Sequence, residues 1–110
     1  MAADLHPEAR AELRLHALWY DEQRPGLGDE FVSEVMTLLE CVEESPASFP
    51  VWPATPVTAS TIRRALLERF PFALAFELRG TRIFVLAVAH AKRRPLYWLE
   101  RTAPSTAQLP

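Results

Sequence analysis

The chain of 110 residues is long enough for one domain with one modest hydrophobic core, and residues 1–101 are expected to form it. Apolar residues make up 49% of the sequence and charged residues 24%, which is typical of globular proteins and excludes fibrous and intrinsically disordered classes. The longest apolar run, Ile83 to Ala89, is far shorter than the roughly 20 residues of a membrane helix, and the N-terminus lacks a secretory pattern, so we expect a cytoplasmic protein without a membrane partner.

Charge is unevenly distributed along the chain. Residues 1–60 carry three basic and eleven acidic side chains, a net charge of −8, whereas residues 61–110 carry nine basic and three acidic ones, a net charge of +6. All but one of these nine are arginine, whose planar guanidinium group pairs well with carboxylates and phosphates. The pattern predicts one anionic and one cationic surface, unless the two halves of the chain pair with each other inside the fold.

Two amphipathic helices are predicted in the first half of the chain. Apolar residues recur at three- and four-residue steps over Glu8–Arg24, and Pro25-Gly26 ends this helix. A second apolar stripe begins at Gly28, with acidic residues in its first turn, and ends at Pro46. Because few residues separate the two helices, they are expected to form an antiparallel hairpin.

The second half of the chain is predicted to form a sheet. Residues 45–60 are proline-rich and read as a connector. The apolar period then becomes alternating, which predicts strands at residues 62–70 and 72–79, and a continuous apolar run predicts a central strand at residues 82–90. Residues 95–101 could form a final strand or extended edge, and the small, polar residues of 102–110 predict a disordered tail. The predicted fold class is therefore α+β, an N-terminal two-helix hairpin packed on a small antiparallel β-sheet.

A series of short motifs runs through the chain: Ala9 to Tyr20 with its Trp-Tyr end, Pro25-Gly26-Leu27-Gly28 with Phe31, the Pro46 to Pro50 segment, Arg63-Arg64, Phe70-Pro71-Phe72, Val85 to His90, and Arg94-Pro95-x-Tyr97-Trp98-x-x-Arg101. In their order and spacing these motifs resemble the RelE/ParE toxin superfamily, and most closely its members labelled plasmid stabilisation proteins. The family fold agrees with the one predicted from periodicity. The family usually has a short strand before the hairpin, for which residues 1–6 are barely long enough.

The resemblance implies the toxin of a type II toxin–antitoxin pair, which inhibits growth and is neutralised by a cognate antitoxin protein that wraps around it. RelE-like members cut messenger RNA on the ribosome, whereas ParE-like members poison DNA gyrase without comparable chemistry. The chain is slightly acidic and has one lysine, which disfavours work inside ribosomal RNA. A ParE-like protein-binding poison, directed at gyrase or an unassigned target, is therefore preferred. The alternatives are a ribosome-dependent endoribonuclease and an inactive relative that serves as an antitoxin-binding module or co-repressor.

Candidate site residues lie in the basic second half. Cleaving RNA needs a base, a cation for the phosphate and an acid, and RelE-like enzymes take these from the sheet and the C-terminal end. The residues here that match those roles are Arg64, His90, Arg94 and Tyr97. Further candidates for binding a partner or nucleic acid are Arg63, Arg69, Lys92, Arg93, Trp98 and Arg101.

Each candidate also has a purely structural interpretation. Arg63 and Arg64 could pair with the acidic helices, and His90 could be a satisfied histidine at the end of a buried strand. Tyr97 and Trp98 could close the edge of the core. No cofactor or metal site is expected, because the sequence has one cysteine, three widely separated histidines and no glycine-rich phosphate loop, and the lone cysteine fits a reducing compartment.

Overall fold

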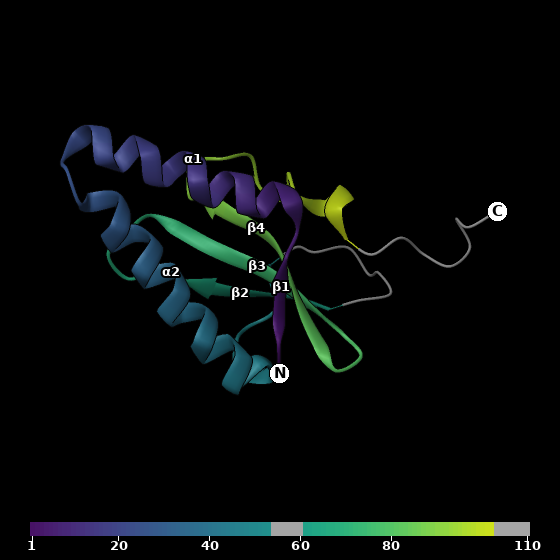
Figure 1. The fold of residues 1–110 in the computed structure, drawn as a ribbon. Helices are drawn as coiled ribbons and strands as arrows, with labels where there is room; N and C mark the ends of the chain where they lie inside the picture. The colour runs from purple at the N-terminus through teal and green to yellow at the C-terminus, as the bar shows by residue number, and fades with distance from the viewer. Residues whose placement is uncertain (54–60, 103–110) are drawn as a thin grey trace.

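The computed structural model describes residues 1–53 and 61–102, and it shows two helices packed on one face of a four-stranded sheet (Figure 1). This confirms the predicted α+β class and the helical hairpin. None of the helices in the described ranges is both long and apolar enough to cross a membrane. In chain order the elements are β1 (Ala3–Leu5), α1 (Pro7–Gln23), α2 (Leu27–Glu44), a 3-10 turn (Pro46–Ser48), β2 (Ile62–Leu66), β3 (Phe72–Arg79), β4 (Arg82–His90) and a second 3-10 turn (Leu99–Arg101).

Local chemistry sets the ends of the helical hairpin. The side chain of His6 caps α1 by accepting a hydrogen bond of 3.0 Å from the Glu8 amide. Gly26 adopts a left-handed conformation, with φ of 89°, at the turn between the helices. At Gly28 the helices approach so closely that a Cβ atom there would lie 2.3 Å from the carbonyl oxygen of Ala17. The hairpin therefore depends on a residue without a side chain at this crossing.

The sheet is mixed, with strand order β1-β4-β3-β2. The three strands β2, β3 and β4 form the predicted antiparallel meander, and Gly80 takes the left-handed conformation in the turn between β3 and β4. The sheet departs from the prediction at its edge, because β1 pairs in parallel with Ile83–Val85 of β4. Three residues before α1 are thus enough to make the short additional strand.

The predicted strand over residues 62–70 is too long, since β2 ends at Leu66. The chain bends after Leu67, and the Glu34 carboxylate of α2 accepts hydrogen bonds from the amides of Glu68, at 2.7 Å, and Arg69, at 3.0 Å. These amides therefore bond to a helix side chain and not to a neighbouring strand. The bend also places the Phe70 ring in the core, 5.2 Å from that of Phe31.

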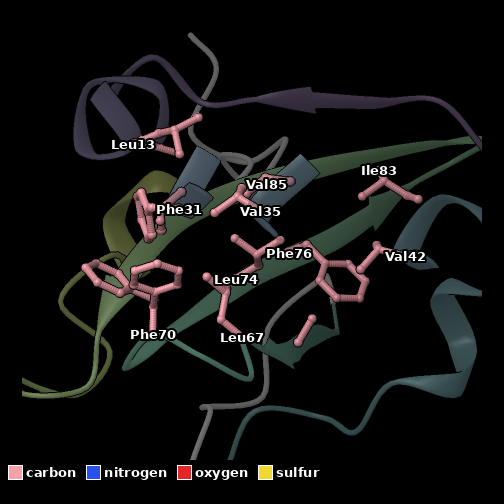
Figure 2. Packing of buried hydrophobic residues seen from close by; sticks show 14 residues of the cluster. Leu13, Phe31, Val35, Val42, Leu67, Phe70, Leu74, Phe76, Ile83 and Val85 are labelled. Carbon is pink, nitrogen blue, oxygen red and sulfur yellow. The ribbon is translucent and has the colours of Figure 1, made fainter. Parts of the chain in front are cut away.

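The main core lies between the helices and the sheet. Phe31 and Val35 of α2 face Leu74 and Phe76 of β3 and Val85 of β4 (Figure 2). All five side chains are essentially excluded from solvent. Burying this apolar surface is the dominant favourable contribution to folding, and it holds the hairpin on the sheet.

A second, smaller core covers the opposite face of the sheet. The prediction of a final strand or extended edge at residues 95–101 is wrong, because this segment forms turns and a short 3-10 helix that pack on that face. Trp98 is fully buried there against Leu86 and packs edge-on against Trp52, with ring centroids 5.0 Å apart. Leu96 has a φ of 61°, the left-handed region, so the backbone reverses within the segment. The apolar side chains gain more by covering the sheet than by extending it.

Candidate functional site

A pocket of about 520 Å³ opens on the second face of the sheet, between β2, the 67–72 bend and the C-terminal segment. Its floor includes Ala73 and Ala89, which are cross-strand partners on β3 and β4. Because both side chains are a single methyl group, the sheet face is recessed at this point. We call this pocket the arginine groove, and its polar lining is Arg64, His90, Arg93, Arg94, Tyr97 and Trp98.

The charged side chains that line the arginine groove are all basic. Three are arginines, from β2 and from the turn after β4, and none of the lining residues in the described ranges is a carboxylate. Across the described ranges, Arg64, Arg93 and Arg94 form no ion pair. The Arg93 guanidinium instead lies 3.9 Å from the centroid of the Tyr97 ring. The groove therefore combines apolar walls with three cations that are available to an anionic ligand.

Two buried donors in the groove lining have no acceptor among the described residues. Arg64 Nε and Trp98 Nε1 are both shielded from solvent, and neither finds a hydrogen-bond partner within residues 1–53 and 61–102. A buried donor without an acceptor costs about 1–3 kcal/mol. A ligand that supplied oxygen acceptors would recover part of this cost.

Tyr97 does not present a free hydroxyl to the groove. Its hydroxyl donates a hydrogen bond of 2.7 Å to the Glu12 carboxylate of α1. Arg101 donates to the same carboxylate at 3.1 Å, and the Val88 amide donates to it at 3.0 Å. Burial, followed by the contact with Glu12, raises the pKa of Tyr97. The phenol therefore stays protonated at neutral pH.

His90 lies in an aromatic cluster at the rim of the groove. Its ring packs edge-on against Phe72, whose ring also contacts His16 of α1, and the two histidine rings are 6.3 Å apart. His90 Nδ1 accepts a hydrogen bond of 3.0 Å from the Lys92 amide, so a neutral ring carries its proton on Nε2. Burial lowers the pKa of His16 below 6.5, and the neighbouring His90 adds to the shift.

Four of the six predicted binding residues lie outside the groove: Arg63, Arg69, Lys92 and Arg101. Arg63 donates to the Phe49 carbonyl at 2.6 Å, and Lys92 is exposed in the turn after β4. The expectation that the acidic and basic halves pair holds for several arginines: Arg69 with Glu30, Arg82 with Asp4, and Arg101 with Glu12. It does not hold for Arg63 or Arg64, which form no ion pair with the described parts of the acidic helices. Trp98 is a buried wall of the groove.

Sequence reasoning missed the roles of Glu12 and His16. Both lie on α1 beside the buried positions Ala9 and Leu13, where a polar residue must find a partner in the fold. A polar residue beside buried positions of a helix was the signal that the sequence offered. The partners of these residues come from the far end of the chain, so local sequence does not identify them. Within the described ranges, no group of three or more His, Cys, Asp or Glu side chains is placed to hold a metal ion.

Comparison with known proteins bears on the fold. No family model matches the sequence, and no curated protein matches it. Among solved structures, the chain is similar to one described as belonging to the chromosomal ParDE TA system from P. aeruginosa, with a TM-score of 0.71 and 20% sequence identity over 84% of this chain and 97% of that chain. The two chains share one fold. This likeness confirms the architecture that the sequence motifs implied, a two-helix hairpin on a small sheet.

Proposed function

We propose that this chain is the toxin of a type II toxin–antitoxin system, that a cognate antitoxin neutralises it, and that it acts as a ParE-like poison by binding a protein in the arginine groove. The fold shared with a chain of a ParDE TA system supports the class of protein. The observation that carries the proposal is the groove itself, which has apolar walls and three arginines without an ion pair among the described residues. Such a surface binds a segment that offers apolar and acidic side chains.

The polar groups of the groove support binding better than catalysis. Cleaving RNA needs a base to activate a ribose hydroxyl and an acid for the leaving oxygen. The Tyr97 hydroxyl is already hydrogen-bonded to Glu12, and its raised pKa disfavours its action as a base. A neutral His90 carries a proton on Nε2 while Nδ1 accepts from the Lys92 amide, so neither nitrogen has a free lone pair.

One observation favours the second candidate, a ribosome-dependent endoribonuclease that uses no metal. The four residues expected to be catalytic, Arg64, His90, Arg94 and Tyr97, all line the same groove. Arginines beside apolar walls can bind a phosphate while a base stacks on an aromatic ring. This function requires Tyr97 to leave Glu12, or His90 to leave the Lys92 amide, when RNA binds.

The decisive experiment is expression of the full chain in a bacterial host under a tightly controlled promoter. We expect growth arrest, relieved when the protein encoded by the adjacent reading frame is co-expressed. The double variant Arg64→Ala/Arg94→Ala should permit growth, whereas the control Arg10→Ala, an exposed arginine of α1 outside the groove, should still arrest it. Normal growth with a soluble, folded wild-type product would contradict the toxin proposal and favour an inactive relative that only binds an antitoxin.

Two further measurements separate the targets. Inhibition of DNA gyrase supercoiling by the purified chain would identify gyrase as the bound protein. Mapping of messenger RNA ends after induction would detect new cleavage sites if the chain acts on the ribosome. Growth arrest with neither result would mean that the poison binds a different protein.

A further inference from the structure

The outward face of α1 carries an apolar stripe, formed by Leu15, Leu18 and Trp19, that packs on no described core. These side chains are 65%, 59% and 53% exposed. Their spacing of three and four residues places them on one side of the helix, away from the buried Ala9 and Leu13. Single exposed apolar residues are common, but three adjacent large ones form a patch that indicates an interface.

The stripe encloses a hollow on the surface of α1. The hollow is lined by Leu15, Leu18, Trp19 and Glu22, together with His16. The first four occupy positions i, i+3, i+4 and i+7 of one helix, which is the arrangement that receives a single side chain of a second helix in helix–helix packing. The hollow therefore fits an apolar side chain from another helix that lies along α1.

Two charged side chains next to the stripe set the direction of that second helix. Arg14 precedes the stripe and Glu22 follows it, and both are exposed. Within residues 1–53 and 61–102 neither of them forms an ion pair. An antiparallel helix with the same order of charges places its acid opposite Arg14 and its base opposite Glu22. The helix α1 has this order itself, so a second copy of the chain meets both requirements.

We propose that the chain forms a symmetric homodimer in which the stripes of two α1 helices pack antiparallel. Leu18 of each copy enters the hollow of the other copy, so the two-fold axis passes close to this residue. Arg14 of one copy then faces Glu22 of the other, and the symmetry makes every such contact twice. The dimer goes beyond the proposed toxin function and does not depend on it, because it uses α1 and not the arginine groove.

Other occupants match less of this surface. A strongly acidic helix would bring like charge to Glu22, and a strongly basic helix would bring like charge to Arg14. A second copy avoids both conflicts when it is antiparallel, whereas a parallel copy would place each charge opposite its own kind. Self-association also covers the stripes of two molecules in one contact, which removes twice the apolar surface from water.

Sedimentation equilibrium of the purified full chain, over a range from about 1 µM to about 500 µM, tests the dimer. The wild type should shift from the monomer mass of 12.5 kDa to twice that mass, with a dissociation constant on the order of 10–100 µM for so small a contact. Leu18→Gln should dimerise more than about 10-fold more weakly. Met36→Gln is the matched control, because it replaces an exposed apolar side chain on α2 and should dimerise as the wild type does.

Reversal of the two charges tests the antiparallel direction. Arg14→Glu alone and Glu22→Arg alone should each dimerise about 10-fold more weakly, because each places like charges opposite one another twice. The combined variant Arg14→Glu/Glu22→Arg restores both pairs and should dimerise within about 3-fold of the wild type. Within one chain the two positions are about 12 Å apart along the helix, so damage to the monomer at one position would not be repaired at the other.

Disulfide cross-linking locates the axis. In a Cys41→Ser background, which removes the exposed native thiol, Leu18→Cys should form a covalent dimer in oxidised glutathione because its two copies meet near the axis. Leu15→Cys should cross-link poorly. Its two copies are displaced by about 9 Å along the helices, which is more than a disulfide spans.

Three results would overturn the dimer. A wild type that stays monomeric over the whole range would mean that a second copy does not cover the stripe. A Leu18→Gln variant that dimerises as tightly as the wild type would place the contact on another surface. Failure of the combined charge reversal to restore dimerisation would exclude the antiparallel pairing. Circular dichroism of each variant verifies folding, which substitution at these exposed positions should preserve.

Discussion

The hydroxyl of Tyr97 donates a hydrogen bond of 2.7 Å to the carboxylate of Glu12, and so joins the C-terminal segment to the first helix. The same carboxylate accepts from Arg101 and from the Val88 amide of β4. Arg101 also donates to the Leu86 carbonyl at 3.1 Å. The strand β1 pairs with only part of the edge of β4. Past the end of β1, the side chains of Glu12 and Arg101 bond to the β4 backbone, and these contacts position one wall of the arginine groove.

Replacing Glu12 with glutamine should destabilise the fold by about 3 kcal/mol, because Arg101 would lose its nearly buried carboxylate partner. The free energy of unfolding in urea measures this effect. Glu22→Gln, at an exposed position on the same helix, should change stability by less than about 0.5 kcal/mol. Equal losses for the two variants would contradict the role assigned to Glu12.

Replacing Tyr97 with phenylalanine separates the two candidate functions. Loss of the hydrogen bond to Glu12 should reduce stability by about 1–2 kcal/mol, and a protein-binding poison should still arrest growth. An endoribonuclease that uses the hydroxyl should instead lose its toxicity and its messenger RNA cleavage. Measuring growth, messenger RNA ends and unfolding on the same variant decides between the two candidate functions. A folded variant that has lost its toxicity would count against the binding proposal.

Replacing Gly28 with alanine should destabilise the hairpin by about 2–3 kcal/mol, because the added Cβ would overlap the Ala17 carbonyl oxygen. Gly80→Ala tests a different mechanism. Apart from the residues next to Gly80 in the chain, no atom of the described residues lies within 4 Å of a Cβ there, and only its left-handed φ of 62° opposes the change, at about 1–2 kcal/mol. Thermal unfolding should therefore show the larger loss at Gly28.

Stability should fall as the solution is acidified, in part because of His16. Burial, together with His90 and Arg93, lowers the pKa of His16 below 6.5, and Glu12 opposes this shift. As the pH falls through 6.5 the unfolded chain gains this proton before the folded one does, so the unfolded state is favoured until the lower folded pKa is reached.

The variant His16→Gln should therefore lose less thermal stability than the wild type between about pH 7.5 and about pH 5.5. Arg14→Gln serves as the control, because it places the same glutamine side chain at an exposed position of α1. An identical dependence of the melting temperature on pH in the wild type and in His16→Gln would show that burial of His16 does not contribute.

Local patterns in the sequence were enough for the helices and for most of the sheet. The 3.6-residue period predicted α1 and α2, and strict alternation predicted β3, because amphipathic elements must place their apolar side chains on one face. A continuous apolar run predicted β4, because a strand that is buried on both faces needs no alternation. The resemblance of the motifs implied a fold that the structural likeness confirms. The predicted tail lies, from residue 103 onward, outside the described residues.

Long-range contacts decided the rest. The segment 95–101 contains consecutive apolar and aromatic residues that suit a strand, but an uncovered sheet face was available to bury Trp98. The sequence by itself determined a basic second half and the residue types of the candidate site. Only the tertiary structure decided which arginines pair and which line the groove, because ion pairing depends on distances between residues such as Glu12 and Arg101, which are 89 positions apart in the chain.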